Sequence, residues 1–133
     1  MRRSRCWAAG AGLVAALLAC AAPRYHMPSG LRGYRYFVAG SDSLSAALSA
    51  ALRRRGVEVV PRLPGGGGPT AAVIHFLFRD PGDSLGPVLH VQVADTRTGV
   101  VIASGSAVLE ALPRPPLGRA EALLDSLGLK SAP

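Results

Sequence analysis

Three histidines, His26, His75 and His90, are the side chains of this chain best suited to proton transfer or metal binding. His75 and His90 lie in two neighbouring apolar segments, so they approach each other if those segments pair as strands. A metal site usually needs three or four protein ligands, and no cysteine or carboxylate cluster near these histidines completes one. The pattern favours histidines held on strand faces by ordinary hydrogen bonds, and no metal site is predicted.

Hydroxyl and carboxyl side chains are scattered along the chain. Ser104 and Ser106 flank Gly105, but neither they nor the serines at positions 41, 43 and 45 stand in a nucleophile-elbow sequence with a base partner. The eight acidic residues fall mostly at expected turns, helix caps and helix surfaces; they are Asp42, Glu58, Asp80, Asp83, Asp95, Glu110, Glu121 and Asp125. We therefore expect a protein that is not an enzyme, has no catalytic residues and needs no cofactor.

Arg53, Arg54 and Arg55 form the one charged cluster with binding potential. Guanidinium groups bind phosphates through paired hydrogen bonds, so these three side chains could contact anionic lipid head groups or the phosphates of lipid A. The pattern favours a second explanation, in which three cations in the last turn of a helix oppose the negative end of its dipole and keep the surface soluble.

Cys20 is the last residue of a leader that has a basic start and an apolar middle. Three arginines within residues 2–5 precede an uncharged apolar segment, residues 7–19, which is too short to remain as a membrane-spanning helix. This arrangement is typical of a secretory signal peptide that is removed after export. The last four residues, Leu17-Leu18-Ala19-Cys20, resemble the lipobox of bacterial lipoproteins.

The lipobox resemblance implies cleavage between Ala19 and Cys20, a diacylglycerol on the Cys20 sulfur and an N-acyl chain on the new terminus. Because each buried CH₂ contributes about 0.8 kcal/mol, these chains together would hold the protein on a membrane. Ala21 and Ala22 follow the cysteine without an aspartate, which in the enterobacterial sorting pattern implies the periplasmic face of the outer membrane rather than the inner membrane. The alternative is ordinary cleavage near residues 21–23, which leaves a soluble secreted protein.

Without residues 1–19, a chain of 114 residues remains, enough for one small domain. Three of the 15 basic residues leave with the leader, so 12 oppose 8 acidic residues and the net charge is +4. This charge is too low for a typical nucleic-acid-binding protein, and export makes nucleic acid a poorer partner still. Cys6 is discarded and Cys20 would be acylated, so neither a disulfide framework nor a thiol nucleophile remains.

The remaining chain divides into three parts. Residues 20–33 carry the lipidated cysteine, two prolines and two glycines without a periodic pattern, which predicts a tether. Residues 34–129 are predicted to form a single α/β domain, and residues 130–133 a tail. Strands are expected at 34–39, 57–60, 71–78, 88–95 and 100–109. Helices are expected between the capping candidates Ser41 and Asp42 and the stop at Gly56, and over residues 117–127.

For two of these strands the sequence also predicts which side chains are buried. Residues 71–78 are almost continuously apolar, which predicts a strand buried on both faces or nearly so. In residues 88–95, the side chains of Leu89, Val91 and Val93 alternate with His90, so they are expected on opposite faces of the sheet.

The segment Asp95-Thr96-Arg97-Thr98-Gly99 predicts a hairpin in which the aspartate bonds to the turn backbone and the glycine takes a positive φ. Gly105 predicts a bulge or bend in the last strand.

The predicted fold class is α/β (α+β), a two-layer sandwich with a mixed sheet of about five strands and two helices on one face, in the order β-α-β-β-β-β-α. Its first strand, helix and second strand are joined by short connections, so the two strands are expected to be parallel through a right-handed crossover.

This order resembles a group of envelope lipoproteins. A strand, then Asp42-Ser43-Leu44 opening a helix that ends Arg55-Gly56-Val57-Glu58-Val59-Val60, and a later Val-Ala-Asp-Thr-Arg-Thr-Gly-Val-Val hairpin are similar to the small domains of curli-secretion and penicillin-binding-protein-activator lipoproteins. With the N-terminal domain of the Tol translocation protein, those domains share a compact α/β sandwich and bind other proteins. The likeness covers residues 34 to about 110. The chain lacks the membrane-inserting hairpins of the curli channel, so pore formation is not implied.

A second resemblance rests on the lipidated cysteine, the lead into Leu31-Arg32-Gly33-Tyr34 and a helix ending in Gly-Val-Glu, and is to the lipopolysaccharide-assembly lipoprotein that plugs its β-barrel partner. We expect a membrane-anchored, periplasm-facing lipoprotein that acts as a non-catalytic interaction module in cell-envelope assembly or secretion. Its expected partners are the membrane, through the lipid anchor, and another envelope protein. The alternative function is the lipopolysaccharide-assembly plug. Neither the identity of the partner nor the oligomeric state follows from the sequence.

Overall fold

A computed structural model of the chain describes residues 25–66, 68–80, 82, 84 and 86–130. Its fold is α+β, with two helices and a four-stranded mixed sheet in the order β-α-β-β-β-α. The elements are β1 (Arg35–Val38), α1 (Ser43–Arg54), β2 (Thr70–Phe78), β3 (Val88–Asp95), β4 (Val101–Val108) and α2 (Pro116–Ser126), with the short 3-10 helices η1 (Ser29–Leu31) and η2 (Leu109–Ala111). The predicted leader, its cleavage point and Cys20 lie outside the described residues.

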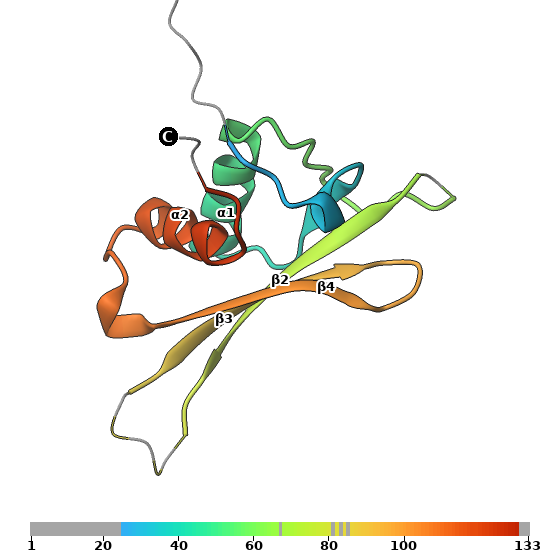
Figure 1. The fold of residues 1–133 in the computed structure, drawn as a ribbon. Coiled ribbons are helices and arrows are strands. Elements are labelled where there is room, and N and C mark those ends of the chain that lie inside the picture. Colours follow the sequence, from blue (N-terminus) through green and yellow to red (C-terminus); the bar gives the residue numbers. More distant parts are fainter. Residues whose placement is uncertain (1–24, 67, 81, 83, 85, 131–133) are drawn as a thin grey trace, which may run out of the picture.

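The strands lie in the order β1-β2-β3-β4. β1 is parallel to β2, and the pairs β2–β3 and β3–β4 are antiparallel. α1 and α2 lie side by side on one face of this sheet (Figure 1). In the described part of the chain, no helix covers the opposite face, which we call the open face.

The sheet has one strand fewer than the sequence predicts, because residues 57–60 do not form a strand. They make a single parallel bridge to β1, in which the Tyr36 N–H donates to the Glu58 carbonyl and the Val60 N–H donates to the Tyr36 carbonyl, both at 2.8 Å. Pro61 follows directly and has no N–H with which to continue the ladder. The predicted parallel direction is therefore correct, whereas the prediction of a fifth strand is wrong.

The core lies between the helices and the sheet. Asp42 caps α1, since its Oδ1 accepts the Ser45 N–H at 2.8 Å, and Gly56 follows the helix with a φ of 74°. Each helix buries one apolar stripe: Ala47, Leu48, Ala51 and Leu52 on α1, and Ala120, Leu123, Leu124 and, just after the helix, Leu127 on the α2 side. These side chains pack on those of Val73, Val91 and Val93 in the centre of the sheet.

Gly105 serves close packing rather than the predicted bulge. A Cβ at this position would overlap the Ser126 Oγ and lie 3.2 Å from the Ser126 carbonyl carbon, so the end of α2 rests directly on the β4 backbone. The irregularity in the β3–β4 pairing falls instead between Val93 and Ala94. The prediction of a bulge or bend at Gly105 is wrong because the glycine is needed to admit a helix.

The prediction of a tether is wrong for residues 25–33, which pack on the domain. Leu31 is 2% exposed, and its carbonyl accepts the Tyr36 hydroxyl at 2.6 Å. Burial raises the pKa of Tyr36 to about 12. The His26 N–H donates to the carbonyl of Lys130 at 2.7 Å, so the two ends of the described chain are bonded to each other.

Candidate functional site

The largest group of exposed apolar side chains lies on the second half of β2. The exposed fractions of Ile74, Phe76, Leu77 and Phe78 are 41%, 42%, 54% and 54%. Figure 1 shows that the helices cover the first half of this strand, whereas the hairpin of β2 and β3 continues beyond them. The prediction that residues 71–78 are buried on both faces is therefore correct only for the beginning of the strand.

The pairing of β2 with β3 places alternate residues on the open face. Leu89, Val91 and Val93 are buried against the helix layer, as their predicted alternation requires, and His90 between them is half-buried on the other face. The antiparallel register sets Phe76 opposite His90. Both side chains therefore lie on the open face.

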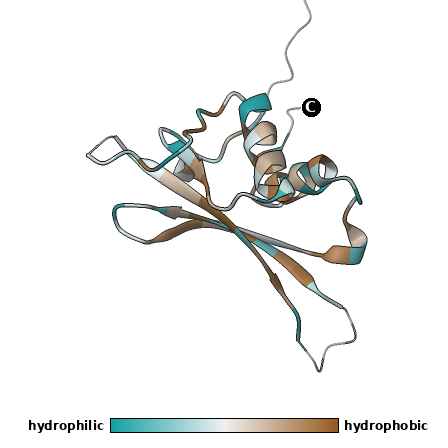
Figure 2. Cartoon of the chain, turned by 180° about the vertical axis from the view of Figure 1, so that it is seen from behind, coloured by the Kyte–Doolittle hydropathy of each residue, from teal (hydrophilic) through white to brown (hydrophobic). Residues whose placement is uncertain are grey.

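Aromatic rings organise this part of the open face. The Phe76 and His90 rings are stacked, with centroids 5.1 Å apart and planes 16° apart, and Phe78 meets His90 edge-on at 6.3 Å. Val88 stands opposite Phe78 in the register, and Ile74 precedes Phe76 on the same face. We call these residues the open-face patch: Ile74, Phe76, Phe78, Val88 and His90. Hydropathy colouring shows apolar segments on this part of the hairpin, beyond the helices (Figure 2).

The surroundings of the open-face patch are polar but uncharged. Gln92 pairs with Ile74, and across β4 the neighbours of Gln92 and His90 are Ser104 and Ser106. No Asp, Glu, Lys or Arg occupies the described open-face positions of β2, β3 and β4. An apolar centre with a neutral hydrogen-bonding rim is the composition of a protein interface rather than of a site for a charged ligand.

The two strand histidines do not approach each other. Their strands pair, but His75 faces the helix layer while His90 lies on the open face. The His75 Nε2 is 3.2 Å from Oδ2 of Asp42. The hydrogen bond from the Ser45 N–H is the main reason that the pKa of Asp42 is lowered. Burial acts in the opposite direction, and the neighbouring His75 lowers this pKa further. In the part of the chain that the structure describes, no three His, Cys, Asp or Glu side chains gather as a metal ion would require.

The candidate nucleophiles are likewise dispersed. Ser104 and Ser106 are exposed on β4, and Ser106 is the register partner of His90. Among the described hydrogen bonds, none joins a serine hydroxyl to a histidine, and the Ser45 hydroxyl donates to the Ala39 carbonyl at 3.1 Å.

Two pockets lie elsewhere on the helix side. One, of about 210 Å³, is lined by serines 41, 45 and 49, Asp42, Arg53 and apolar residues of 59–61. The other, of about 340 Å³, lies between η2 and α2 and is lined by Leu109, Glu110, Leu112, Arg114 and Arg119. Neither brings a histidine together with a nucleophile.

The predicted arginine cluster is divided by the fold. The Arg55 side chain is only 2% exposed, and its Nη2 lies 2.6 Å from Glu121 Oε2 and 2.9 Å from Asp125 Oδ1. This arginine therefore joins α1 to α2 and is not available for the predicted contact with phosphate. Arg54 is 58% exposed and lies 3.8 Å from Glu121, and Arg53 is also exposed. Lipid binding by Arg53 and Arg54 stays a prediction.

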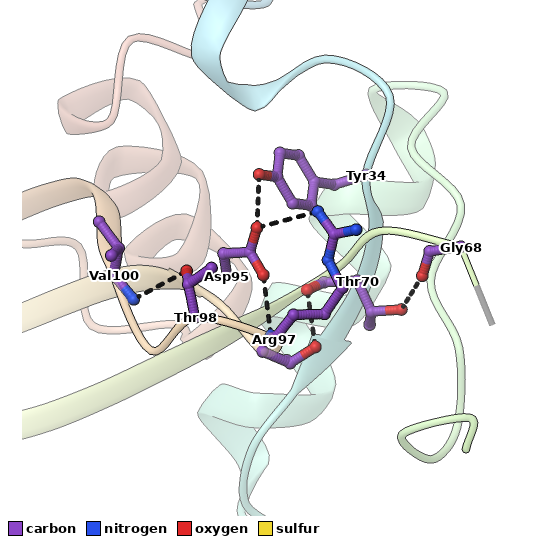
Figure 3. A network of polar contacts seen from close by, with 8 residues as sticks. Tyr34, Gly68, Thr70, Asp95, Arg97, Thr98 and Val100 are labelled. Atoms are coloured by element: carbon purple, nitrogen blue, oxygen red, sulfur yellow. Dashed lines mark hydrogen bonds and ion pairs between the residues drawn. The ribbon is translucent and has the colours of Figure 1, made fainter. Parts of the chain in front are cut away.

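A polar network surrounds the buried Asp95 in the turn between β3 and β4 (Figure 3). Asp95 is 5% exposed and accepts the Tyr34 hydroxyl at 2.9 Å and the Arg97 N–H at 2.8 Å. The Arg97 N–H, helped by the Tyr34 hydroxyl, lowers the pKa of Asp95, and the same Tyr34–Asp95 bond raises the pKa of Tyr34. Gly99 has a φ of 71°, so the predicted turn is confirmed and this carboxylate has a structural role.

No protein-family model matches this chain, and no curated protein matches its sequence. The resemblances to envelope lipoproteins therefore stay predictions. Neither helix in the described ranges is long and apolar enough to cross a bilayer.

Proposed function

We propose that the protein is a lipid-anchored module of the cell envelope that faces the periplasm and binds another protein through the open-face patch, without catalysis. The observation that carries this proposal is the set of exposed side chains on the second half of β2. Soluble monomers rarely expose a large contiguous apolar patch, and the largest one on a monomer is often functional.

The patch also has the chemistry of a binding surface. Phe76 and Phe78 leave 42% and 54% of their surface exposed, and both rings contact the His90 ring, one stacked and one edge-on. Aromatic side chains are enriched at protein interfaces because they bury a large area at a low cost in conformational entropy. A charged or strongly hydrated ligand would find no paired charge here, which favours a protein with an apolar surface.

The anchoring half of the proposal is supported by the lipobox resemblance. Cleavage after Ala19 and acylation of Cys20 would place the domain on the outer membrane, with the inner membrane as the alternative destination. The two-layer arrangement of helices over one sheet face is also what the resemblance to curli-secretion and synthase-activator lipoproteins implies, and those domains bind proteins.

Site-specific photo-crosslinking in the native membranes tests the proposal. A photoreactive amino acid at Phe76 or Phe78 is expected to capture one partner protein in high yield. Leu63 is the matched control, because it is equally apolar and 50% exposed but lies in a loop away from the patch. Equal capture from Leu63 and Phe76, or no capture from either phenylalanine, would overturn the proposal. Capture of a large outer-membrane barrel would favour the lipopolysaccharide-assembly plug over a synthase or secretion accessory.

A further inference from the structure

The chain enters the domain at a fixed point. The Arg55 guanidinium lies over the Tyr25 ring, 5.1 Å from its centroid, and the same guanidinium is held by Glu121 and Asp125. One residue later, the His26 N–H donates to the carbonyl of Lys130. Residue 25 is therefore fastened at the C-terminal end of α1, beside the last two turns of α2, and we call this surface the anchor end.

The length of chain between Cys20 and the anchor end is short. Five peptide links separate Cys20 from Tyr25, and a fully extended chain covers at most about 3.6 Å per residue, or about 18 Å in total. A tether that extended to residue 33, as the sequence predicts, would reach roughly 45–50 Å. The packing of residues 25–33 removes most of that freedom.

The open-face patch lies far from this entry point. In Figure 1 the described chain begins beside the C-terminal end of α1, close to where the described chain ends, and the hairpin of β2 and β3 projects from the opposite side of the molecule. Patch and anchor end therefore cannot both lie on one flat surface.

We propose that, when Cys20 carries its lipid, the anchor end rests on the head groups of that membrane and the open-face patch points away from it into the periplasm. This inference rests on the lipidation in the proposed function. Arg54 and Lys130 are exposed at the anchor end and are positively charged, which suits anionic head groups. Glu121 and Asp125 are partly exposed there and share Arg55, so with Arg54 and Lys130 three cations face two carboxylates.

The opposite orientation, with the patch on the membrane, is disfavoured by the hairpin itself. Arg79 and Asp80 directly follow the exposed half of β2, and both are exposed. Pushing the phenylalanines into a bilayer would carry these charges toward the hydrocarbon, where charged side chains are costly. The partner of the patch is therefore expected on the aqueous side of the anchoring membrane.

Fluorescence quenching tests the orientation. Apart from Cys20 and Cys6, which leaves with the leader, the chain has no cysteine, so an introduced cysteine is labelled uniquely. Arg54→Cys and Lys130→Cys report on the anchor end, and Leu77→Cys and Ser106→Cys on the hairpin and the open face. The lipidated variants are labelled with a fluorophore and placed in anionic vesicles that contain a lipid with a nitroxide on its head group. We expect several-fold stronger quenching at positions 54 and 130 than at 77 and 106.

Each failure has a separate signature. The mass of the N-terminal peptide reports lipidation, and an unmodified Cys20 would overturn both this inference and the anchoring half of the proposed function. A lipidated protein with equal quenching at all four positions, or stronger quenching at 77 and 106, would overturn the orientation alone. A flexible insertion after Pro23 is the matched control. It lengthens the connection without touching Tyr25, and should abolish the difference between the two pairs of labels.

Discussion

The two halves of β2 are built from similar residues but lie in opposite surroundings. Val73 is fully buried under the helices, and Leu77, four residues later on the same face of the sheet, exposes 54% of its surface. The difference arises from element lengths: the 12 residues of α1 span about 18 Å, whereas the nine residues of β2 span about 30 Å. A helix layer of this length covers only part of such a strand, so apolar character in the sequence does not by itself reveal what is buried.

The first half of β2 should stabilise the fold and the second half should not. One substitution in each half measures this difference. Val73→Ala is expected to lower the free energy of unfolding by about 2 kcal/mol, because it leaves a cavity in the core. Phe78→Ala should change it by less than about 0.5 kcal/mol, as expected for an exposed position. Urea denaturation of both variants tests this prediction. Equal losses would mean that the hairpin belongs to the core.

The ion pairs of Arg55 with Glu121 and Asp125, which join α1 to α2, should also stabilise the helix-covered part of the molecule. Arg55→Ala removes the cation that two partly exposed carboxylates share, so we expect a loss of about 1–2 kcal/mol in the free energy of unfolding. Arg54→Ala is the matched control, since its exposed ion pair should contribute less than about 0.5 kcal/mol. An equal loss of unfolding free energy in Arg54→Ala and Arg55→Ala would contradict the prediction that only Arg55 joins the helices.

Acid should lower the free energy of unfolding of the domain, because it protonates Asp95. Because the pKa of Asp95 is lowered in the folded state, this group stabilises the fold fully above its ordinary value of about 3.9, and the contribution is lost as the pH falls through the lowered folded pKa. Tyr34→Phe removes one of the bonds that lower this pKa, so less stability should be lost on acidification. Thermal unfolding between about pH 3 and pH 6 measures the slope. An unchanged slope in Tyr34→Phe would exclude this role for the Tyr34–Asp95 bond.

The smallest effect is expected from salt. The open-face patch carries no fixed charge, so the affinity for a partner captured at Phe76 should change little between about 0.05 and 0.5 M ionic strength. Binding of the anchor end to anionic vesicles should weaken over the same range, because Arg54 and Lys130 act through charge. A patch affinity that falls steeply with salt would indicate that charged residues outside the patch dominate the contact.

Local features of this fold were accessible from the sequence because each depends on neighbouring residues. The Asp42 cap, the stop at Gly56 and the turn from Asp95 to Gly99 are short-range patterns, and all three are present. The alternation along β3 identified its buried face for the same reason.

The errors share a different origin, since each depends on an element distant in the sequence. Gly105 faces α2, which the strand pattern does not reveal. Leu31 packs in the core although its own segment has no periodicity, and Arg55 finds its carboxylates 66 and 70 positions later. The residues of the open-face patch read locally as those of a buried strand, and they are exposed because both helices lie on the other face of the sheet.

If the chain is exported and processed as proposed, the Tyr25–Arg55 contact also implies an order of events in its maturation. The residues that fasten the start of the domain all follow it by many positions: Arg55, its carboxylate partners Glu121 and Asp125, and Lys130. On export as proposed, these residues would emerge after Cys20, so the segment around Cys20 would stay unclamped until they follow. For a chain processed as proposed, this delay gives the acylating and cleaving enzymes access to Cys20 before folding draws it close to the finished domain.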